Sequence, residues 1–203
     1  WAQGGIVYSP NNRSQEILKD DIYTAGGNDN HTDAVNQLVS IGPKLIEEIL
    51  INKIQIPFEK DSDGQLLFTS EAAHSDKSII HCKDATGLII HQKIIEQLSQ
   101  HPQIIIYTQH TAVDLLTYSH HSISPLDIYE EPACFGAITL HHETNQLKTI
   151  IAKKTILATG GLGQLYLHST NPNESRGDGI AMAWRAGARC VNLHYIQFHP
   201  TAL

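Results

Sequence analysis

The sequence predicts an α/β or α+β fold, on three observations. Segments whose apolar residues recur at helical spacing alternate with short apolar runs typical of strands. Glycine pairs such as Gly26-Gly27 and Gly160-Gly161 separate these segments. The chain of 203 residues is long enough for one ordinary domain, and it contains no repeat at a fixed period.

In the first part of the chain, the residue pattern predicts an apolar run followed by three helices. Ser14 is a candidate N-cap, because its hydroxyl can accept a hydrogen bond from an unpaired helical N–H group. Gly42-Pro43 should break the second helix, since proline lacks the N–H group that a helix interior needs. The expected order is a glycine-containing turn leading into an apolar run in residues 1–8, followed by helices over residues 14–23, 32–41 and 45–50.

The rest of the chain predicts more strands than helices. Asp63-Gly64 is typical of a hairpin turn, and Thr86 is a candidate N-cap for an amphipathic helix. Gly187 is a candidate stop for the last helix. The expected strands are residues 53–58, 65–68, 104–107, 112–116, 134–140, 147–151 and 154–158, and the expected helices are 86–100 and 179–186.

Composition and charge exclude several classes of protein. The chain is 41% hydrophobic and 17% charged, which is inconsistent with a disordered acidic chain. No apolar run approaches the roughly 20 residues that span a bilayer. With 14 basic and 21 acidic residues the net charge is −7, so a nucleic-acid groove lined by clustered Lys and Arg is not expected.

The cysteines and histidines do not form a metal site or a disulfide framework in this sequence. Cys82, Cys134 and Cys190 are widely spaced, so a reducing compartment such as the cytoplasm is the simplest interpretation. The chain has thirteen histidines, but the pairs His120-His121 and His141-His142 are adjacent, and their side chains diverge on a strand. We therefore expect no bound metal.

Two glycine-rich segments are candidates for cofactor binding. The apolar run over residues 154–158 ends at Thr159 and Gly160-Gly161, where a backbone without Cβ atoms can approach a nucleotide phosphate or ring. A tight turn without a ligand is the alternative. Gly177-Asp178-Gly179 opens a helix, whose N–H groups favour an anion or a polar ring edge, although Asp178 can equally be the helix N-cap.

Two polar segments are candidates for substrate binding. Glu71 and His74 are three residues apart and can converge on one ligand, with Ser75 beside them; a solvated loop is the alternative. Pro200 fixes the backbone after His199 and so directs the imidazole, although a lone histidine is more often structural.

Taken in order, six segments together resemble the flavoprotein subunits of succinate dehydrogenase and fumarate reductase. They are Ala-Gln-Gly-Gly-Ile at 2–6, Asp-Ala-Thr-Gly at 84–87, Ala-Thr-Gly-Gly at 158–161, Thr-Asn-Pro at 170–172, Gly-Asp-Gly-Ile-Ala-Met-Ala at 177–183 and Gln-Phe-His-Pro-Thr at 197–201. The resemblance covers nearly the whole chain. It implies an α/β fold, namely part of a Rossmann-like FAD-binding domain with an antiparallel β excursion near residues 104–151.

Within this family the chain looks most like the L-aspartate oxidases. Trp1 precedes the first segment, as an aromatic residue usually does in the oxidases, and Glu71 stands where the dicarboxylate enzymes carry an apolar residue. A carboxylate near the ammonium group of aspartate supplies a charge-assisted hydrogen bond, which succinate cannot use. The chain departs from the oxidases at Ala72-Ala73, where they have two glycines, and at Asp76-Lys77-Ser78, where they usually have basic residues.

The resemblance implies non-covalent FAD as cofactor and oxidation of L-aspartate to iminoaspartate, with O2 or fumarate as acceptor. This is the first step of NAD biosynthesis through quinolinate, with a possible transfer of product to quinolinate synthase. The alternatives are a succinate dehydrogenase or fumarate reductase flavoprotein, and a non-catalytic module that has lost flavin binding. Residues 1–191 are expected to be the central part of the FAD-binding domain, and residues 192–203 the start of a truncated cap domain.

The resemblance also assigns the site residues. Glu71 and His199 would be catalytic, with Glu71 on the substrate ammonium and His199 on a substrate carboxylate. The substrate pocket would comprise Glu71, His74, Ser75, His199 and Thr201, and the cofactor contacts Gln3, Gly4, Gly5, Thr111, Ala112, Ala158, Thr159, Gly160, Gly161 and Asp178. The N-terminal βαβ unit with its phosphate loop, the catalytic arginine and the cap domain are expected outside this chain, which should be inactive alone.

Overall fold

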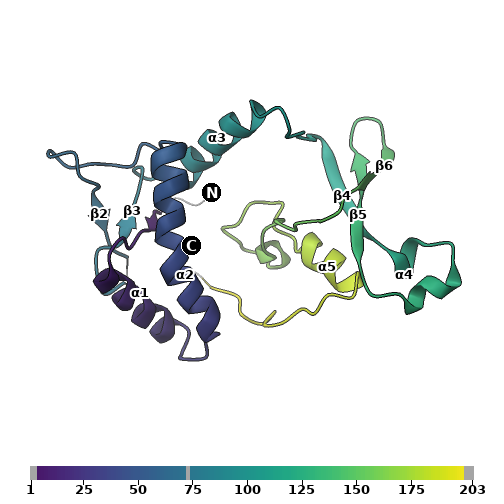
Figure 1. Cartoon of the computed structure of the whole chain (residues 1–203), viewed down its shortest axis with the longest axis horizontal. Helices are drawn as coiled ribbons and strands as arrows, with labels where there is room; N and C mark the ends of the chain where they lie inside the picture. Colours follow the sequence, from purple (N-terminus) through teal and green to yellow (C-terminus); the bar gives the residue numbers. More distant parts are fainter. Residues whose placement is uncertain (1–3, 72–73, 199–203) are drawn as a thin grey trace. The chain divides into compact units, whose positions relative to one another are not determined.

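The computed structural model describes residues 4–71 and 74–198, and the chain divides into two compact units, Trp1–Ile105 and Ile106–Leu203 (Figure 1). The first unit contains β1 (Ile6–Val7), α1 (Asn12–Ala25), α2 (Thr32–Leu45), the π-helix η1 (Ile46–Lys53), β2 (Phe68–Thr69), β3 (Ile79–Ile80) and α3 (Thr86–Ser99). The second unit contains β4 (His110–Thr117), α4 (Tyr118–His121), the 3-10 helix η2 (Pro125–Tyr129), β5 (Cys134–His141), β6 (Gln146–Ile151), the 3-10 helix η3 (Gly163–Leu165) and α5 (Asp178–Arg185).

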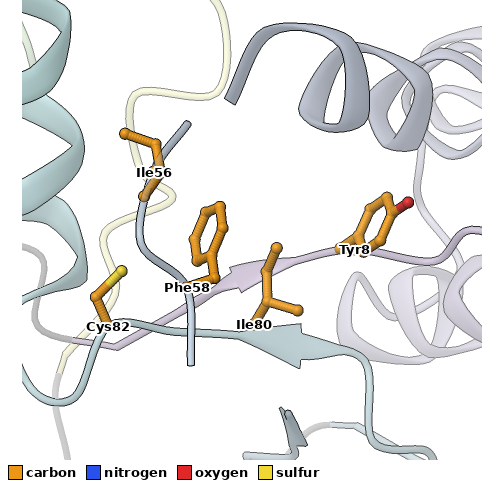
Figure 2. Packing of buried hydrophobic residues seen from close by; sticks show 5 residues of the cluster. All are labelled: Tyr8, Ile56, Phe58, Ile80 and Cys82. Carbon is orange, nitrogen blue, oxygen red and sulfur yellow. The ribbon is translucent and has the colours of Figure 1, made fainter. Parts of the chain in front are cut away.

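A small antiparallel sheet in the order β1-β3-β2 forms the centre of the first unit. Its middle strand brings Ile80 opposite both Ile6 and Phe68. The buried cluster around Ile80 also contains Tyr8, Ile56, Phe58 and Cys82 (Figure 2). Glu71, His74 and Ser75 lie between β2 and β3 in the sequence, so this sheet holds both ends of the segment that carries these candidate substrate residues. Strand β3 was not predicted, because two residues are too short to give a periodic pattern.

Helix α1 begins two residues earlier than the sequence predicts, and its N-cap is Asn11. The Asn11 Oδ1 accepts a hydrogen bond from Ser14 N–H at 2.9 Å, and Ser14 Oγ lies 3.4 Å from Asn11 N. These two contacts form a capping box, in which Ser14 is the third helical residue. The prediction of Ser14 as N-cap was therefore wrong, although the stop at Gly26 is confirmed.

Pro43 lies inside helix α2 and does not break it. Val35, Val39 and Pro43 are all buried and are spaced by four residues, so they share one packed face of the helix. Their burial offsets the missing N–H group of the proline. The chain then continues without interruption into the π-helix η1. The predicted break at Gly42-Pro43 was wrong for this reason.

Three predicted strands are absent from the described chain. In residues 53–58 the N–H groups of Ile56 and Phe58 donate to Leu50 and Ile56 oxygens, so the backbone turns back toward η1. Residues 104–107 and 154–158 are not strands either, and no described strand pairs with them. Every described strand pairing is antiparallel, so the parallel strands that a Rossmann-like domain implies are not seen in residues 4–71 and 74–198.

The second unit is built on an antiparallel sheet in the order β4-β5-β6. The predicted hairpin around Asn145 is confirmed, and this residue adopts a positive φ of 53°. The pairing of β4 with β5 shifts between Ala112 and Asp114, which leaves Val113 as a bulge. The antiparallel excursion near residues 104–151 is thus confirmed, and its bulge turns toward α5, as described below.

Helices α3 and α5 are confirmed, but the predicted N-cap of α3 was wrong. The N-cap of α3 is Ala85, and the buried Thr86 is its first residue. The Thr86 Oγ1 accepts a hydrogen bond from Cys82 N–H at 2.9 Å, so the hydroxyl stabilises the preceding turn. Helix α5 ends at Arg185, and Gly187 follows with a φ of 86°, as expected of a C-terminal stop.

Candidate active site

In the first unit, the loop that carries Glu71 lies against the start of β1. A Cβ atom placed on Gly4 would stand 2.8 Å from Glu71 Oε1. Any residue larger than glycine at position 4 would therefore push the carboxylate away. The structure thus brings two of the predicted site residues, Gly4 and Glu71, into one place, and both are exposed to solvent.

Gly5 has a packing role. A Cβ atom at this position would overlap Ile79 Cγ2 and the Ile80 carbonyl oxygen. Glycine is thus needed for β1 to approach β3 closely enough to pair. The backbone of Gly5 was expected to approach another group closely, and in the structure it approaches strand β3.

Ser75 is bound to helix α1. Its N–H group donates to Asp21 Oδ2 at 2.9 Å, and its hydroxyl donates to Asp21 Oδ1 at 2.6 Å. The hydrogen bonds from the Ser75 hydroxyl and backbone, with the charge of His74, lower the pKa of Asp21 against a weaker effect of burial. Asp21 therefore anchors the loop as a carboxylate, a role that the sequence did not reveal.

His74 lies next to this anchor. Its backbone N–H group donates to Glu71 O at 3.0 Å, which joins these two candidate site residues. Its ring is half-buried, and the Nδ1 atom is buried without a hydrogen-bond partner in the described part of the chain. A buried ring nitrogen without a partner is costly, so it is a natural position for a polar ligand atom.

In the second unit, the glycine loop after residue 158 packs against the start of α5. Gly177 N–H donates to Gly161 O at 3.1 Å, and Gly177 has a φ of 83°. A Cβ atom on Gly179 would overlap the Thr159 side chain. Glycines at 177 and 179 therefore let the helix lie directly on the loop.

The other side of this loop is open. Gly160 has a φ of 74°, and a Cβ atom on Gly161 would meet no atom within 4 Å. Thr159, Gly160, Gly161 and Ala158 are exposed. The loop thus presents bare backbone to its surroundings while α5 supports it from behind, which suits a flat ring or a phosphate.

Asp178 is the first residue of α5 and is not its cap. The N-cap is Gly177, and Arg176 Nη2 lies 3.2 Å from Asp178 Oδ2. The interpretation of Asp178 as N-cap was therefore wrong. Its exposed carboxylate still lies in the first helical turn, where negative charge is favourable.

Thr111 and Ala112 lie on β4 and pair with Leu140 and Thr139 of β5. The Thr111 hydroxyl is 2.6 Å from the Nε2 atom of His142, so its side chain contacts the turn that follows β5. The backbone at Ala112 directly precedes the bulge at Val113. An irregular strand offers the kind of backbone groups that can contact an adenine.

An ion pair that the sequence did not predict fastens α5 to β4. Arg185 Nε and Nη2 donate to the two Asp114 oxygens, both at 3.3 Å, and Nη2 also donates to Val113 O at 3.2 Å. Burial raises the pKa of Asp114, but hydrogen bonds from Arg185 and Leu115 N–H, with the charges of Arg185 and His121, outweigh it, and the pKa falls. No sequence signal joins residues 71 positions apart.

The second unit also contains a cavity of about 480 Å³. It brings together parts of two sequence segments that carried the resemblance, because Thr170 and Asn171 line it with Gln197 and Phe198. The full lining is Gly163, Tyr166, Leu167, His168, Ser169, Thr170, Asn171, Ile196, Gln197 and Phe198.

Some expected features fall outside the described residues or are absent from them. Gln3, His199 and Thr201 lie outside residues 4–71 and 74–198. Within those ranges no group of three or more metal-ligating side chains occurs. No helix in the described ranges is both long and apolar enough to cross a membrane.

The exposed glycine loop and its supporting helix are suited to a cofactor that is bound through backbone groups. Comparison with known proteins agrees: the family model described as an FAD binding domain matches residues 1–203, so the chain belongs to that family. Its cofactor is FAD. The glycine loop and the start of α5 are suited to FAD. Gly160 and Gly161 leave room for a flat ring, and the N-terminus of α5 is adjacent.

Several curated relatives are L-aspartate oxidases. L-aspartate oxidase 1 of Ralstonia nicotianae is 39% identical over 206 residues, which cover 100% of this chain and 37% of that protein. The Pseudomonas aeruginosa L-aspartate oxidase is 36% identical, over 100% of this chain and 38% of its own length. The chloroplastic Arabidopsis thaliana enzyme is 35% identical, over 100% and 30%. The chain thus spans about a third of the length of these relatives.

Solved structures confirm the fold. The chain resembles the E. coli quinol fumarate reductase FrdA carrying an E245Q mutation, with a TM-score of 0.79 and 23% identity. The match covers 91% of this chain and 29% of that one. The Mycobacterium smegmatis Sdh1 complex with UQ1 matches with a TM-score of 0.76 and 23% identity, over 91% of this chain and 31% of that chain.

Proposed function

We propose that this chain is part of an L-aspartate oxidase that converts L-aspartate to iminoaspartate, with O2 or fumarate as electron acceptor. The observation that carries the proposal is the Glu71 carboxylate, which lies 2.8 Å from the position of a Gly4 Cβ atom at the start of β1. A carboxylate here suits the substrate ammonium. Relatives that are 35–39% identical and bear the name L-aspartate oxidase support it.

Each proposed substrate residue has a chemical task. Glu71 binds the ammonium group, whereas His199 and Thr201 bind the substrate carboxylates. His74 lines the same pocket, and its buried Nδ1 atom needs a partner. FAD, when bound, supplies the two-electron acceptor for the hydride that leaves the substrate α-carbon. The protein residues bind and orient the substrate.

The cofactor contacts are assigned on the same basis. Gly160 and Gly161 present the backbone along which FAD lies, and Asp178 contacts its flavin portion. Thr111 and Ala112 provide backbone groups for the adenine. Gln3, Gly4, Gly5, Ala158 and Thr159 complete the set, and the FAD is bound without a covalent link.

The proposal also covers the domain boundaries, the use of the product and the cellular compartment. Residues 1–191 are the central part of the FAD-binding domain, and residues 192–203 begin a cap domain. The product enters NAD biosynthesis through quinolinate, with transfer to quinolinate synthase. Three free cysteines are consistent with a reducing compartment, for which we propose the cytoplasm.

The test uses the full-length protein that contains this chain, loaded with FAD. L-aspartate or succinate is added without oxygen while the flavin absorbance is followed. Bleaching by L-aspartate alone is the expected result. Bleaching by succinate alone would assign the protein to the dicarboxylate enzymes, and the absence of any flavin after FAD addition would indicate a non-catalytic module.

Glu71 is tested in the same protein. Glu71→Gln should lower kcat/KM for L-aspartate at least about tenfold, because the ammonium loses its charged partner. Glu48→Gln is the matched control, since Glu48 is an exposed carboxylate on η1. If the two variants behave alike, Glu71 does not bind the ammonium group.

A further inference from the structure

The anchor between Ser75 and Asp21 joins parts of the chain that are 54 residues apart. Both Asp21 oxygens accept a hydrogen bond, one from the Ser75 backbone and one from its hydroxyl, at 2.9 and 2.6 Å. Asp21 lies in the last third of α1 and is half-buried. Hydrogen bonds to a carboxylate are about twice as strong as those between neutral groups, so this anchor is strong for its size.

The hydrogen-bonding capacity of Ser75 is largely used by this anchor. A serine has one backbone N–H and one hydroxyl hydrogen to donate, and both are directed at Asp21. A substrate carboxylate accepts hydrogen bonds and donates none. Ser75 could therefore bind a substrate carboxylate only by giving up its bond to Asp21.

We propose that Asp21 is a positioning residue, which holds the loop bearing Glu71 and His74 in place and through which Ser75 acts. This inference rests on the proposed function. It replaces direct substrate contact by Ser75 with an indirect role.

The hydrogen bonds between Asp21 and Ser75 affect Glu71 through His74. His74 N–H donates to Glu71 O at 3.0 Å, so Glu71 is joined directly to the residue that precedes Ser75. The Asp21 carboxylate also attracts the His74 ring electrostatically. Fixing Ser75 on α1 thus restrains the backbone of Glu71, whose carboxylate lies beside Gly4, and a displacement of about 1 Å at such a group can cost a hundredfold in rate.

The test is a double-mutant cycle in the full-length enzyme loaded with FAD. Asp21→Ala and Ser75→Ala should each lower kcat/KM for L-aspartate about tenfold, and the double variant should be no worse than Asp21→Ala alone. Ser75→Thr keeps both donors and should retain activity within about threefold. Asp20→Asn is the control, because Asp20 is an exposed carboxylate one position earlier on α1.

Two readouts separate positioning from a general loss of structure. FAD affinity should stay unchanged in Asp21→Ala and Tm should fall by no more than about 4 °C, the effect of losing two hydrogen bonds at the surface, while kcat falls. Hydrogen exchange of a peptide containing residues 71–75 should become at least about threefold faster in Asp21→Ala than in Asp20→Asn, without any substrate.

Several outcomes would overturn the inference. Losses that multiply in the double variant would show that Ser75 and Asp21 act separately, and unchanged exchange would show that Asp21 does not hold the loop. Equal losses in Asp20→Asn, or a lower Tm in proportion to activity, would show a general effect. If the wild-type flavin is not bleached by L-aspartate, the proposed function fails and the catalytic role fails with it, whereas the exchange rates still decide the anchoring.

Discussion

A methyl group added at Gly179 or at Gly161 would meet opposite surroundings, although both glycines belong to the same loop and helix contact. At Gly179 the added carbon overlaps the Thr159 side chain, whereas at Gly161 it meets nothing within 4 Å. Gly179 is therefore required for packing. Gly161 is free to serve a ligand, because nothing in the described chain fills the space beside it.

This contrast gives a prediction with two separate readouts. Gly179→Ala should destabilise the full-length protein by about 1–3 kcal/mol, the usual cost of forcing extra volume into a packed contact. Gly161→Ala should change stability by less than about 0.5 kcal/mol, yet weaken FAD binding at least tenfold. Thermal unfolding of the FAD-free protein and titration with FAD measure the two effects. Equal FAD affinities for wild type and Gly161→Ala would show that the cofactor does not lie on this loop.

Single residues were predictable where the chemistry is local. Gly187 was expected to end a helix and does so with a positive φ, and Asn145 lies in the expected hairpin. Asp21 could not be found in this way, because its partner is 54 residues away in sequence. Ser14 was recognised as a capping residue, but Asn11 is equally suited and only the extended backbone at Asn11 decides between them.

At the scale of elements, the bulge in β4 and the end of α5 form one contact. The bulge exposes the Val113 carbonyl and the Asp114 carboxylate, and Arg185 binds both. The other end of α5 packs on Thr159 through Gly179. Helix α5 is therefore fixed at both ends, and the glycine loop is held by the helix that the ion pair anchors.

Asp114→Asn tests this anchor. Because the pKa of Asp114 is lowered in the folded protein, the wild-type carboxylate adds stability above its ordinary pKa of 3.8 and loses it as the pH falls through the folded-state value. With the Asp114 and Arg185 side chains 29% and 42% exposed, solvent screens the pair. We expect Asp114→Asn to cost about 1 kcal/mol near neutral pH.

The pH dependence distinguishes this ion pair from a packing effect. Unfolding of wild type and Asp114→Asn, measured from about pH 7 to about pH 3, should give stabilities that converge at the acid end. Glu143→Gln is the control, since Glu143 is an exposed carboxylate at the turn between β5 and β6. A difference that stays constant over the whole range would contradict the ion-pair explanation.

Elements were predictable when their stabilising contacts are close in sequence. The hairpin of β5 and β6 and the helices α3 and α5 were all found, because the turn at Asn145, the apolar periodicity of α3 and the stop at Gly187 are local signals. Residues 154–158 have the composition of a strand, yet a strand forms only against a partner, which composition does not reveal. At Pro43 a local signal was misleading. Proline favours a helix break, but its burial with Val35 and Val39 keeps helix α2 intact.

For the whole molecule, the proposed substrate and cofactor residues are distributed over both units. Glu71 and His74 belong to the unit Trp1–Ile105, whereas Gly160, Gly161 and Asp178 belong to Ile106–Leu203. The family match and the fold were both recognisable from short segments spread over the entire chain. Glycine makes such segments informative, because its missing Cβ atom permits close backbone contacts such as those of Gly5 with Ile80 and of Gly179 with Thr159.

The proposed cofactor contacts predict how FAD and its fragment FMN should act on the full-length protein. FAD at about one hundred times its Kd should stabilise the folded state by about 2.7 kcal/mol and raise Tm. FMN contains the flavin but no adenine, so it cannot use the backbone groups proposed at Thr111 and Ala112, and it should raise Tm less at equal concentration. The comparison is made by thermal unfolding of the FAD-free protein. Equal shifts for FAD and FMN would remove β4 from the cofactor site, whereas no shift with either would contradict cofactor binding by the glycine loop itself.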